Sequence, residues 1–137
     1  MASPVRSTIR EVPPSLATVA GIFVGSTSGT TVQRLLLNAD GTGDFVNVAF
    51  NSSSNKVSRY NVRVRSFTNW KIALDLVSAS GARPIRATGE LRFFDASLRL
   101  PAMEGYRARS IRLFREQTLM SMMETAREAM ASAPHQQ

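Results

Sequence analysis

Apolar and polar residues alternate one by one through the middle of the chain, and this period of two is typical of β-strands with one buried face. Segments 57–65, 69–77 and 85–94 show the pattern most clearly. Their apolar positions are Tyr60, Val62, Val64, Trp70, Ile72, Leu74, Leu76, Ile85, Ala87, Gly89, Leu91 and Phe93. Most of the intervening positions are charged or polar, so each segment predicts a strand with one face toward a core.

Further segments have strand-like composition and are separated by turn residues. They are residues 20–26, 31–38, 44–50 and 106–114, with a short strand within 96–105. One strand every 8–12 residues or so predicts an all-β sandwich or barrel. Three consecutive strands that each have an apolar face must have that face covered by another part of the fold. About eight strands are enough for the sheet to close into a barrel. We therefore expect a mainly β fold, an antiparallel up-and-down barrel of about eight strands with one C-terminal α-helix.

The stretch LLLNADGTGDF predicts a β-hairpin that turns at Asp40 and Gly41. Two registers are open. A two-residue loop places Leu36 opposite Phe45, whereas a loop that also takes in the next residue places Leu37 there. A one-residue slip exchanges the two faces of a strand. Because the triple leucine makes both faces apolar, we expect the barrel interior on one side and the C-terminal helix as a cover on the other.

Residues 115–131 predict an amphipathic helix, because apolar residues recur every three or four positions. Its apolar stripe consists of Leu119, Met122, Met123, Ala126 and Met130. The favoured interpretation packs this stripe against the outside of the barrel. The alternative is a methionine-rich face that binds a partner or a second copy, since Met adapts to irregular surfaces. A homodimer would then use Leu119, Met122, Met123 and Met130.

Length and composition are those of one ordinary globular domain. The 137 residues are 43% hydrophobic and 20% charged. Residues 1–15 are rich in Ser, Pro and Arg and predict an extended arm, which leaves 16–137 for a single domain. No apolar run is long enough to span a membrane, and no signal peptide is recognisable. A cytoplasmic location is expected, although a mature exported protein would look the same.

The residue types for most catalytic chemistry are missing. The chain has no Cys, and its one His, His135, lies near the C-terminus. The chain therefore lacks the residues that form disulfides, thiolate nucleophiles and Cys-ligated metal sites, and it has almost none for a positioned imidazole. The stretch GSTSGT at 25–30 lacks the Gly-Lys-Ser/Thr of a phosphate loop and predicts a turn. Cross-strand ion pairs account for Asp75 and Glu90. We expect a protein that is not an enzyme and holds no metal or cofactor.

A net charge of +7, carried largely by arginine, raises nucleic acid as a possible partner. Sheets that bind single strands interleave aromatic side chains with basic ones. Here the aromatic residues of the alternating strands fall on the apolar side, opposite the arginines. This separation counts against nucleic-acid binding, which stays an alternative.

The segment Gly21-Ile22-Phe23 resembles the Gly-x-Trp element of lipocalins, with Phe in place of Trp. Arg112 stands where that family carries an arginine that packs across the first-strand aromatic. A helix after the last strand is also shared, whereas the family's Thr-Asp-Tyr element is absent. Over residues 20–131 the chain therefore resembles a lipocalin or, more broadly, a calycin. The resemblance implies reversible binding of a small, mainly apolar molecule in the barrel mouth.

A barrel of about eight strands is either filled by its own side chains or holds one small ligand, and the sequence leaves both open. The expected function is non-enzymatic binding of a small apolar or amphipathic ligand inside the barrel. The candidate wall is Tyr60, Trp70, Ile72, Leu74, Phe93 and Tyr106. At the rim, Arg107 or Arg109 is the candidate contact for an acidic head group. The competing function is an interaction module that forms homo-oligomers through its helix or a sheet edge.

Overall fold

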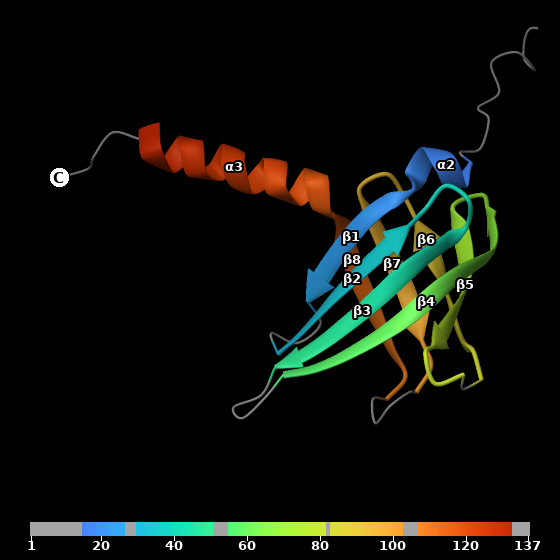
Figure 1. Cartoon of the computed structure of the whole chain (residues 1–137). Helices are drawn as coiled ribbons and strands as arrows, with labels where there is room; N and C mark the ends of the chain where they lie inside the picture. Colours follow the sequence, from blue (N-terminus) through green and yellow to red (C-terminus); the bar gives the residue numbers. More distant parts are fainter. Residues whose placement is uncertain (1–14, 27–29, 51–54, 82, 103–106, 133–137) are drawn as a thin grey trace, which may run out of the picture.

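Eight antiparallel strands close into one barrel in the computed structural model, which describes residues 15–26, 30–50, 55–81, 83–102 and 107–132 (Figure 1). Each strand pairs with its neighbours in sequence, and β8 closes the ring by pairing with β1. The strands are β1 (Gly21–Ser26), β2 (Thr31–Leu37), β3 (Thr42–Phe50), β4 (Asn55–Thr68), β5 (Lys71–Ser78), β6 (Ile85–Leu91), β7 (Asp95–Leu100) and β8 (Arg109–Arg115). The helices are α2 (Leu16–Val19) and α3 (Glu116–Ser132). The predicted up-and-down barrel with a C-terminal helix is confirmed.

The inward positions of the strands form the hydrophobic core. Phe23, Leu35, Phe45, Leu74 and Leu113 are all at most 1% exposed. Along each strand buried and exposed residues alternate, as the period of two predicted. Large side chains from opposite walls therefore meet inside the barrel. Most of the expected arm, residues 1–14, lies outside the described part of the chain.

The β2–β3 hairpin has a register that differs from both expected ones. Leu35, rather than Leu36 or Leu37, lies opposite Phe45. Leu35 and Leu37 point into the core, while Leu36 is half-buried on the outer face. Both registers expected from the sequence are therefore wrong.

The cause of this register is a three-residue loop, 39–41, which begins one residue earlier than expected. The backbone N–H of Asn38 donates to the carbonyl of Thr42 at 2.8 Å and closes the loop. Gly41 takes the left-handed conformation that this loop needs, with φ 92°. The Asp40 carboxylate accepts hydrogen bonds from the Thr42 hydroxyl at 2.6 Å and backbone N–H at 2.9 Å. These bonds, the hydroxyl first, lower the pKa of Asp40.

One end of the barrel is closed by α2 and tied together by Arg115. The Arg115 guanidinium stacks over the Phe23 ring, 4.8 Å from its centroid. It donates to the carbonyls of Val19 at 2.8 Å and Ala20 at 3.1 Å, and also to that of Phe93. Arg115 thus joins the last strand to α2, to β1 and to the β6–β7 turn. Burial lowers its pKa.

The arginine that packs across the first-strand aromatic is therefore Arg115, and the expectation for Arg112 is wrong. Side chains alternate along β8, so Arg112 and Arg115 lie on opposite faces of the strand. Arg112 points outward and pairs with Asp95 at 2.9 Å. The arrangement itself, a cation stacked on the aromatic of Gly-x-Phe, is the one that the resemblance implied.

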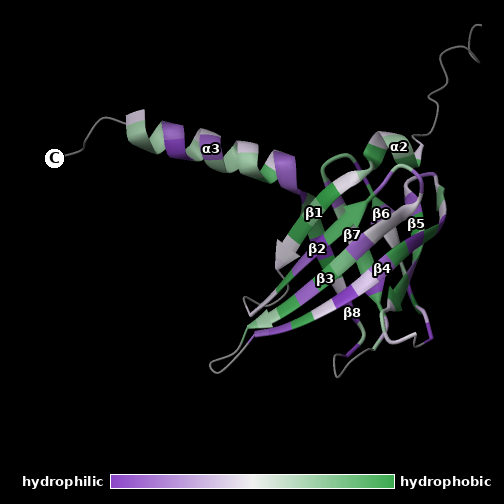
Figure 2. Cartoon of the chain, in the orientation of Figure 1, coloured by the Kyte–Doolittle hydropathy of each residue, from purple (hydrophilic) through white to green (hydrophobic). Residues whose placement is uncertain are grey.

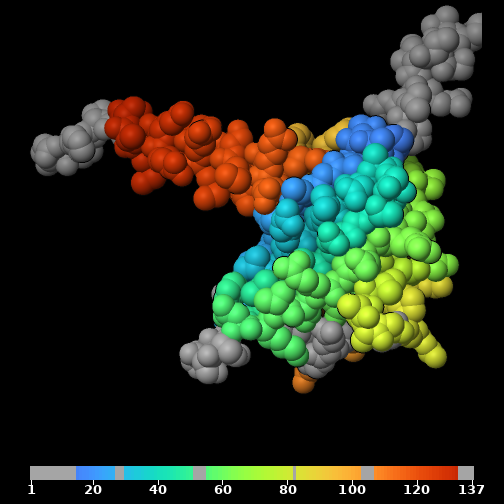
Figure 3. All heavy atoms as spheres, viewed as in Figure 1, coloured from blue at the N-terminus to red at the C-terminus, as the bar shows by residue number. Residues whose placement is uncertain are grey.

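Beyond its first turn, helix α3 projects away from the barrel (Figures 1 and 3). No residue of α3 is buried. The expected packing of the helix against the barrel wall, as a cover for the outer side of the hairpin, is therefore wrong. The physical reason is the connection: β8 ends at Arg115 and α3 begins at Glu116, so no residue is free to turn the helix back.

Candidate functional site

Three of the expected wall residues do line the barrel interior. Tyr60, Ile72 and Leu74 point inward and are at most 3% exposed. The Phe45 and Tyr60 rings lie 6.2 Å apart in a tilted arrangement. At exposures this low, neighbouring side chains already fill the space around these residues. The interior that they line is packed in the described structure.

Trp70 and Phe93 instead lie in turns at the end of the barrel that α2 closes. Trp70 belongs to the two-residue β4–β5 turn, in which it and Asn69 both have positive φ, 70° and 56°. Phe93 lies in the β6–β7 turn and is 43% exposed. Their rings meet edge to face with centroids 5.4 Å apart. The expected placement of both residues within strands is wrong, because each strand is shorter here than its alternation suggested.

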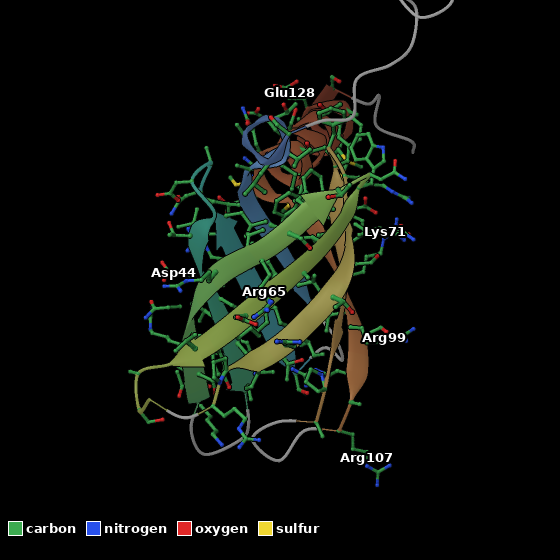
Figure 4. All side chains as sticks on the ribbon, turned by 90° about the vertical axis from the view of Figure 1, so that its right-hand side faces the viewer. Asp44, Arg65, Lys71, Arg99, Arg107 and Glu128 are labelled. Carbon is green, nitrogen blue, oxygen red and sulfur yellow. The ribbon has the colours of Figure 1, made fainter. Side chains whose placement is uncertain are left out.

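The two rim arginines differ in direction. Arg107 is exposed and points away from the barrel at the end opposite α2, which is lowest in Figure 4. Arg109, the first residue of β8, shares the inward face with Ile111 and Leu113. Tyr106 lies outside the described residues.

Inside the end opposite α2, Arg109 meets two buried amides. Gln33 and Asn47 face each other across β2 and β3, and the Gln33 amide N–H donates to the Asn47 side-chain oxygen at 2.8 Å. Arg109 donates to the same oxygen at 3.4 Å. We call these three residues the polar cluster. Sequence reasoning missed Gln33 and Asn47, although both occupy inward positions of alternating strands.

The neighbours of the polar cluster are uncharged. Thr31 and Ser58 lie on the same inward face, and the buried Thr31 hydroxyl has no hydrogen-bond partner within the described residues. A guanidinium with amide and hydroxyl groups around it can hold an anionic or strongly polar group. The cluster has no carboxylate, imidazole or thiol, and so it lacks a group that exchanges protons near neutral pH.

The second candidate site is the apolar stripe of α3, defined by Leu119, Met122, Met123, Ala126 and Met130. Figure 2 shows hydrophobic and hydrophilic residues following one another along the projecting helix. Met122 is 63% and Met130 79% exposed. Leu119, at the base of the helix, is half-buried where it meets the barrel. An exposed stripe of this kind marks an interaction surface.

A second apolar surface lies on the outside of the barrel, next to the base of α3. Val24 on β1 lies beside Phe114 on β8, and Val32, Val48 and Val57 form a row across β2, β3 and β4. We call these five residues the outer patch. Phe114 is 40% and Val57 51% exposed. Valines on a solvent-facing barrel wall are costly unless something covers them.

The base of α3 stands between two hollows. One, of 640 Å³, lies between the helix and Ile22 on β1 and reaches Met120 and Met123. The other, of 650 Å³, joins Leu119 to the outer patch at Val32 and Phe114. The stripe and the outer patch therefore meet at a corner of the molecule.

The remaining outer wall, across β5 to β8, is different in character. Its hollow of 490 Å³ has small side chains on its floor, including Ala73, Thr88 and Ser97. Ion pairs surround it: Asp75 pairs with Arg65 at 2.9 Å. The expected cross-strand ion pairing is thus observed for Asp75, whereas Glu90 pairs with Arg92, two residues along the chain, and not across strands. Apart from Phe114 of the outer patch, the outward side chains around this hollow are small, polar or charged.

Charge is unevenly divided between the helix and the rest of the chain. Three acidic residues and Arg127 give α3 a net charge of −2, which leaves +9 for the remainder of the chain. Arg34, Arg59 and Arg112 are exposed on the same outer wall as the outer patch.

The described residues offer neither a metal site nor a membrane-spanning helix. They contain no cluster of three or more His, Asp or Glu side chains suited to a metal ion. None of their helices combines the length and the apolarity needed to cross a membrane.

Comparison with protein-family models, curated proteins and solved structures found no match.

Proposed function

We propose that this protein is a non-enzymatic interaction module, in which a rigid barrel holds out α3 for association with a second copy of the chain. The observation that carries the proposal is a helix of 17 residues with an apolar stripe and no buried residue. Burying one large apolar side chain contributes about 1.5–3 kcal/mol. Several methionines on one stripe therefore give association a strong driving force.

Helix energetics support the same proposal. An isolated helix shorter than about 12–15 residues is marginal in water, and most helical stability in proteins comes from packing one face. Helix α3 is near this length and packs only its first turn against the barrel. Association would supply the missing packing. Methionine suits such a contact, since its flexible side chain adapts to an irregular partner.

The experiment is sedimentation velocity on the full chain and two matched double variants. Met122→Lys with Met123→Lys places two charges on the stripe. Gln117→Lys with Ser121→Lys adds the same charge on the opposite side of the helix. We expect the wild type and the control to associate with rising concentration and the stripe variant to stay monomeric. At dilutions where all three are monomeric they should unfold at similar denaturant concentrations, because no α3 residue is buried in the monomer. Equal association of both variants would refute the proposal.

Binding of a small amphipathic ligand is a second candidate, supported by the polar cluster. Arg109 with Gln33 and Asn47 offers an acidic head group several donors, and the Thr31 hydroxyl adds an unused one. The ligand's apolar part would have to displace packed core side chains. Titration with a fluorescent fatty acid tests this: saturation at one per chain that Arg109→Met abolishes supports it, and absence of saturable binding removes it.

A further inference from the structure

We infer that the outer wall around the 490 Å³ hollow binds single-stranded nucleic acid, with its cations on the backbone and nearby aromatic rings against the bases. The inference goes beyond the proposed self-association and does not depend on it, because α3 is not part of this wall. Two features that lie next to each other carry it: a wall rich in cations and a pair of aromatic rings at one end of that wall. Proteins that bind single strands combine these two features.

The wall carries more cations than its carboxylates neutralise. Outward positions of β5, β6, β7 and the second half of β4 hold the residues that we call the basic wall: Arg63, Arg65, Lys71, Arg86 and Arg99. Asp75 pairs with Arg65 at 2.9 Å and lies 3.9 Å from Arg86. Glu90 pairs with Arg92. The carboxylates of this wall are thus already occupied, and an excess of positive charge is left.

Two cations of the basic wall line its hollow without an ion pair. Within the described residues, neither Lys71 nor Arg99 meets a carboxylate. Figure 4 shows both side chains projecting outward on the same side of the barrel. The hollow is also lined by hydroxyl groups, including those of Thr88 and Ser97. Lysine, arginine and hydroxyl side chains are the groups that donate to phosphate oxygens of nucleic acids.

The cations follow one another along the strands. Lys71 belongs to the outward row nearest the end that α2 closes, Arg99 to the next row, and Arg86 to the row after that. Successive outward rows are two residues, or about 7 Å, apart. The three cations therefore form a path that suits the repeating charges of an extended strand. The acidic helix α3 projects to the other side of the barrel and does not oppose this charge (Figure 1).

Aromatic rings lie at the start of this path. Trp70 directly precedes Lys71, and its ring meets that of Phe93, which is 43% exposed. The backbone N–H of Leu91 donates to the carbonyl of Trp70 at 2.9 Å and joins the two turns. Alternation argues against nucleic acid only if Trp70 and Phe93 lie opposite the arginines. In their turns they lie beside the cations instead, where a base can stack on an exposed ring.

The test measures binding of a labelled oligothymidylate to the full chain by fluorescence anisotropy. Inorganic polyphosphate and a DNA duplex of matched charge are the competitors. Phe93→Ala removes a ring beside the basic wall. Its control is Phe50→Ala at the far end of β3, where the ring is 45% exposed. We expect Phe93→Ala to weaken binding about 5-fold or more, because one base loses its stacking partner, and Phe50→Ala to leave binding unchanged.

A second pair of variants tests the cations. Lys71→Gln with Arg99→Gln removes two charges from the basic wall, and Arg34→Gln with Lys56→Gln removes the same charge elsewhere. All four side chains are exposed, so the fold should be kept. Each phosphate contact to a single strand contributes about −0.7 to the slope of log affinity against log salt. We therefore expect the wall variant to reduce that slope by about 1.4 and the control to keep it.

Four results would overturn the inference. Polyphosphate or the duplex may compete as well as unlabelled oligothymidylate, which would show general attraction of polyanions. Each variant and its control may weaken binding equally, which would place the contacts elsewhere. Oligothymidylate may fail to bind even at low salt. None of these results bears on self-association, which sedimentation measures without nucleic acid.

Discussion

At the residue scale, Arg115 connects several segments at the end of the barrel that α2 closes. It stacks on Phe23 and donates to carbonyls of three separate segments, α2, the start of β1 and the β6–β7 turn. Hydrogen bonds that involve a charged group contribute about 1.5–3 kcal/mol each, and backbone carbonyls left unpaired on burial add a penalty. The sequence indicated that an arginine would do this but pointed to Arg112. Strand β8 extends one residue beyond its expected end, to Arg115. Because side chains alternate between the two faces of a strand, Arg115 and not Arg112 then points to the first-strand aromatic.

This assignment makes a stability prediction. We expect Arg115→Ala to lower the free energy of unfolding by about 2–4 kcal/mol, because three carbonyls lose their donor and Phe23 loses its cation. Arg112→Ala is the matched control. Its ion pair with Asp95 is solvent-exposed and contributes less than about 1 kcal/mol. Urea denaturation measures both, and equal losses for the two variants would contradict the assignment.

At the element scale, the strands were predictable and their ends were not. A period of two identifies a strand wherever one face is buried, and so residues such as Tyr60, Val62 and Leu74 were placed correctly. Turn geometry, in contrast, depends on backbone conformations that composition does not report. Trp70 takes a left-handed conformation that few bulky residues adopt, and so a strand was expected where a turn occurs. The polar cluster was missed because Gln33 and Asn47 resemble surface residues until their strands are aligned.

The β2–β3 hairpin gives a pH prediction. Hydrogen bonds from Thr42 lower the pKa of Asp40 in the folded chain below its value in the unfolded chain. Asp40 therefore contributes stability that is fully present above its unfolded pKa of about 3.9 and is lost as pH falls through the folded value. We expect Thr42→Val to raise the Asp40 pKa and to reduce the loss of unfolding free energy that occurs as pH falls. NMR titration of the Asp40 carboxyl group measures this pKa. An Asp40 pKa that Thr42→Val leaves unchanged would argue against the hydrogen bonds.

At the scale of the whole molecule, a packed barrel and an unpacked helix occur in one chain. The barrel buries its own core, with inward side chains such as Phe23 and Leu98 at most 2% exposed. The helix buries nothing. The sequence predicted an amphipathic helix but not its direction, because the direction depends on the missing linker between Arg115 and Glu116. Beyond Leu119 the amphipathic stripe thus has no partner among the described residues, and a second chain is the simplest partner.

The most direct test of self-association is the mass of the unmodified full chain by sedimentation equilibrium over a dilution series. The chain mass is 15.0 kDa. We predict a reversible shift from this mass at high dilution to twice this mass at high concentration. A mass of 15.0 kDa at every concentration, with α3 intact by circular dichroism, would contradict the account.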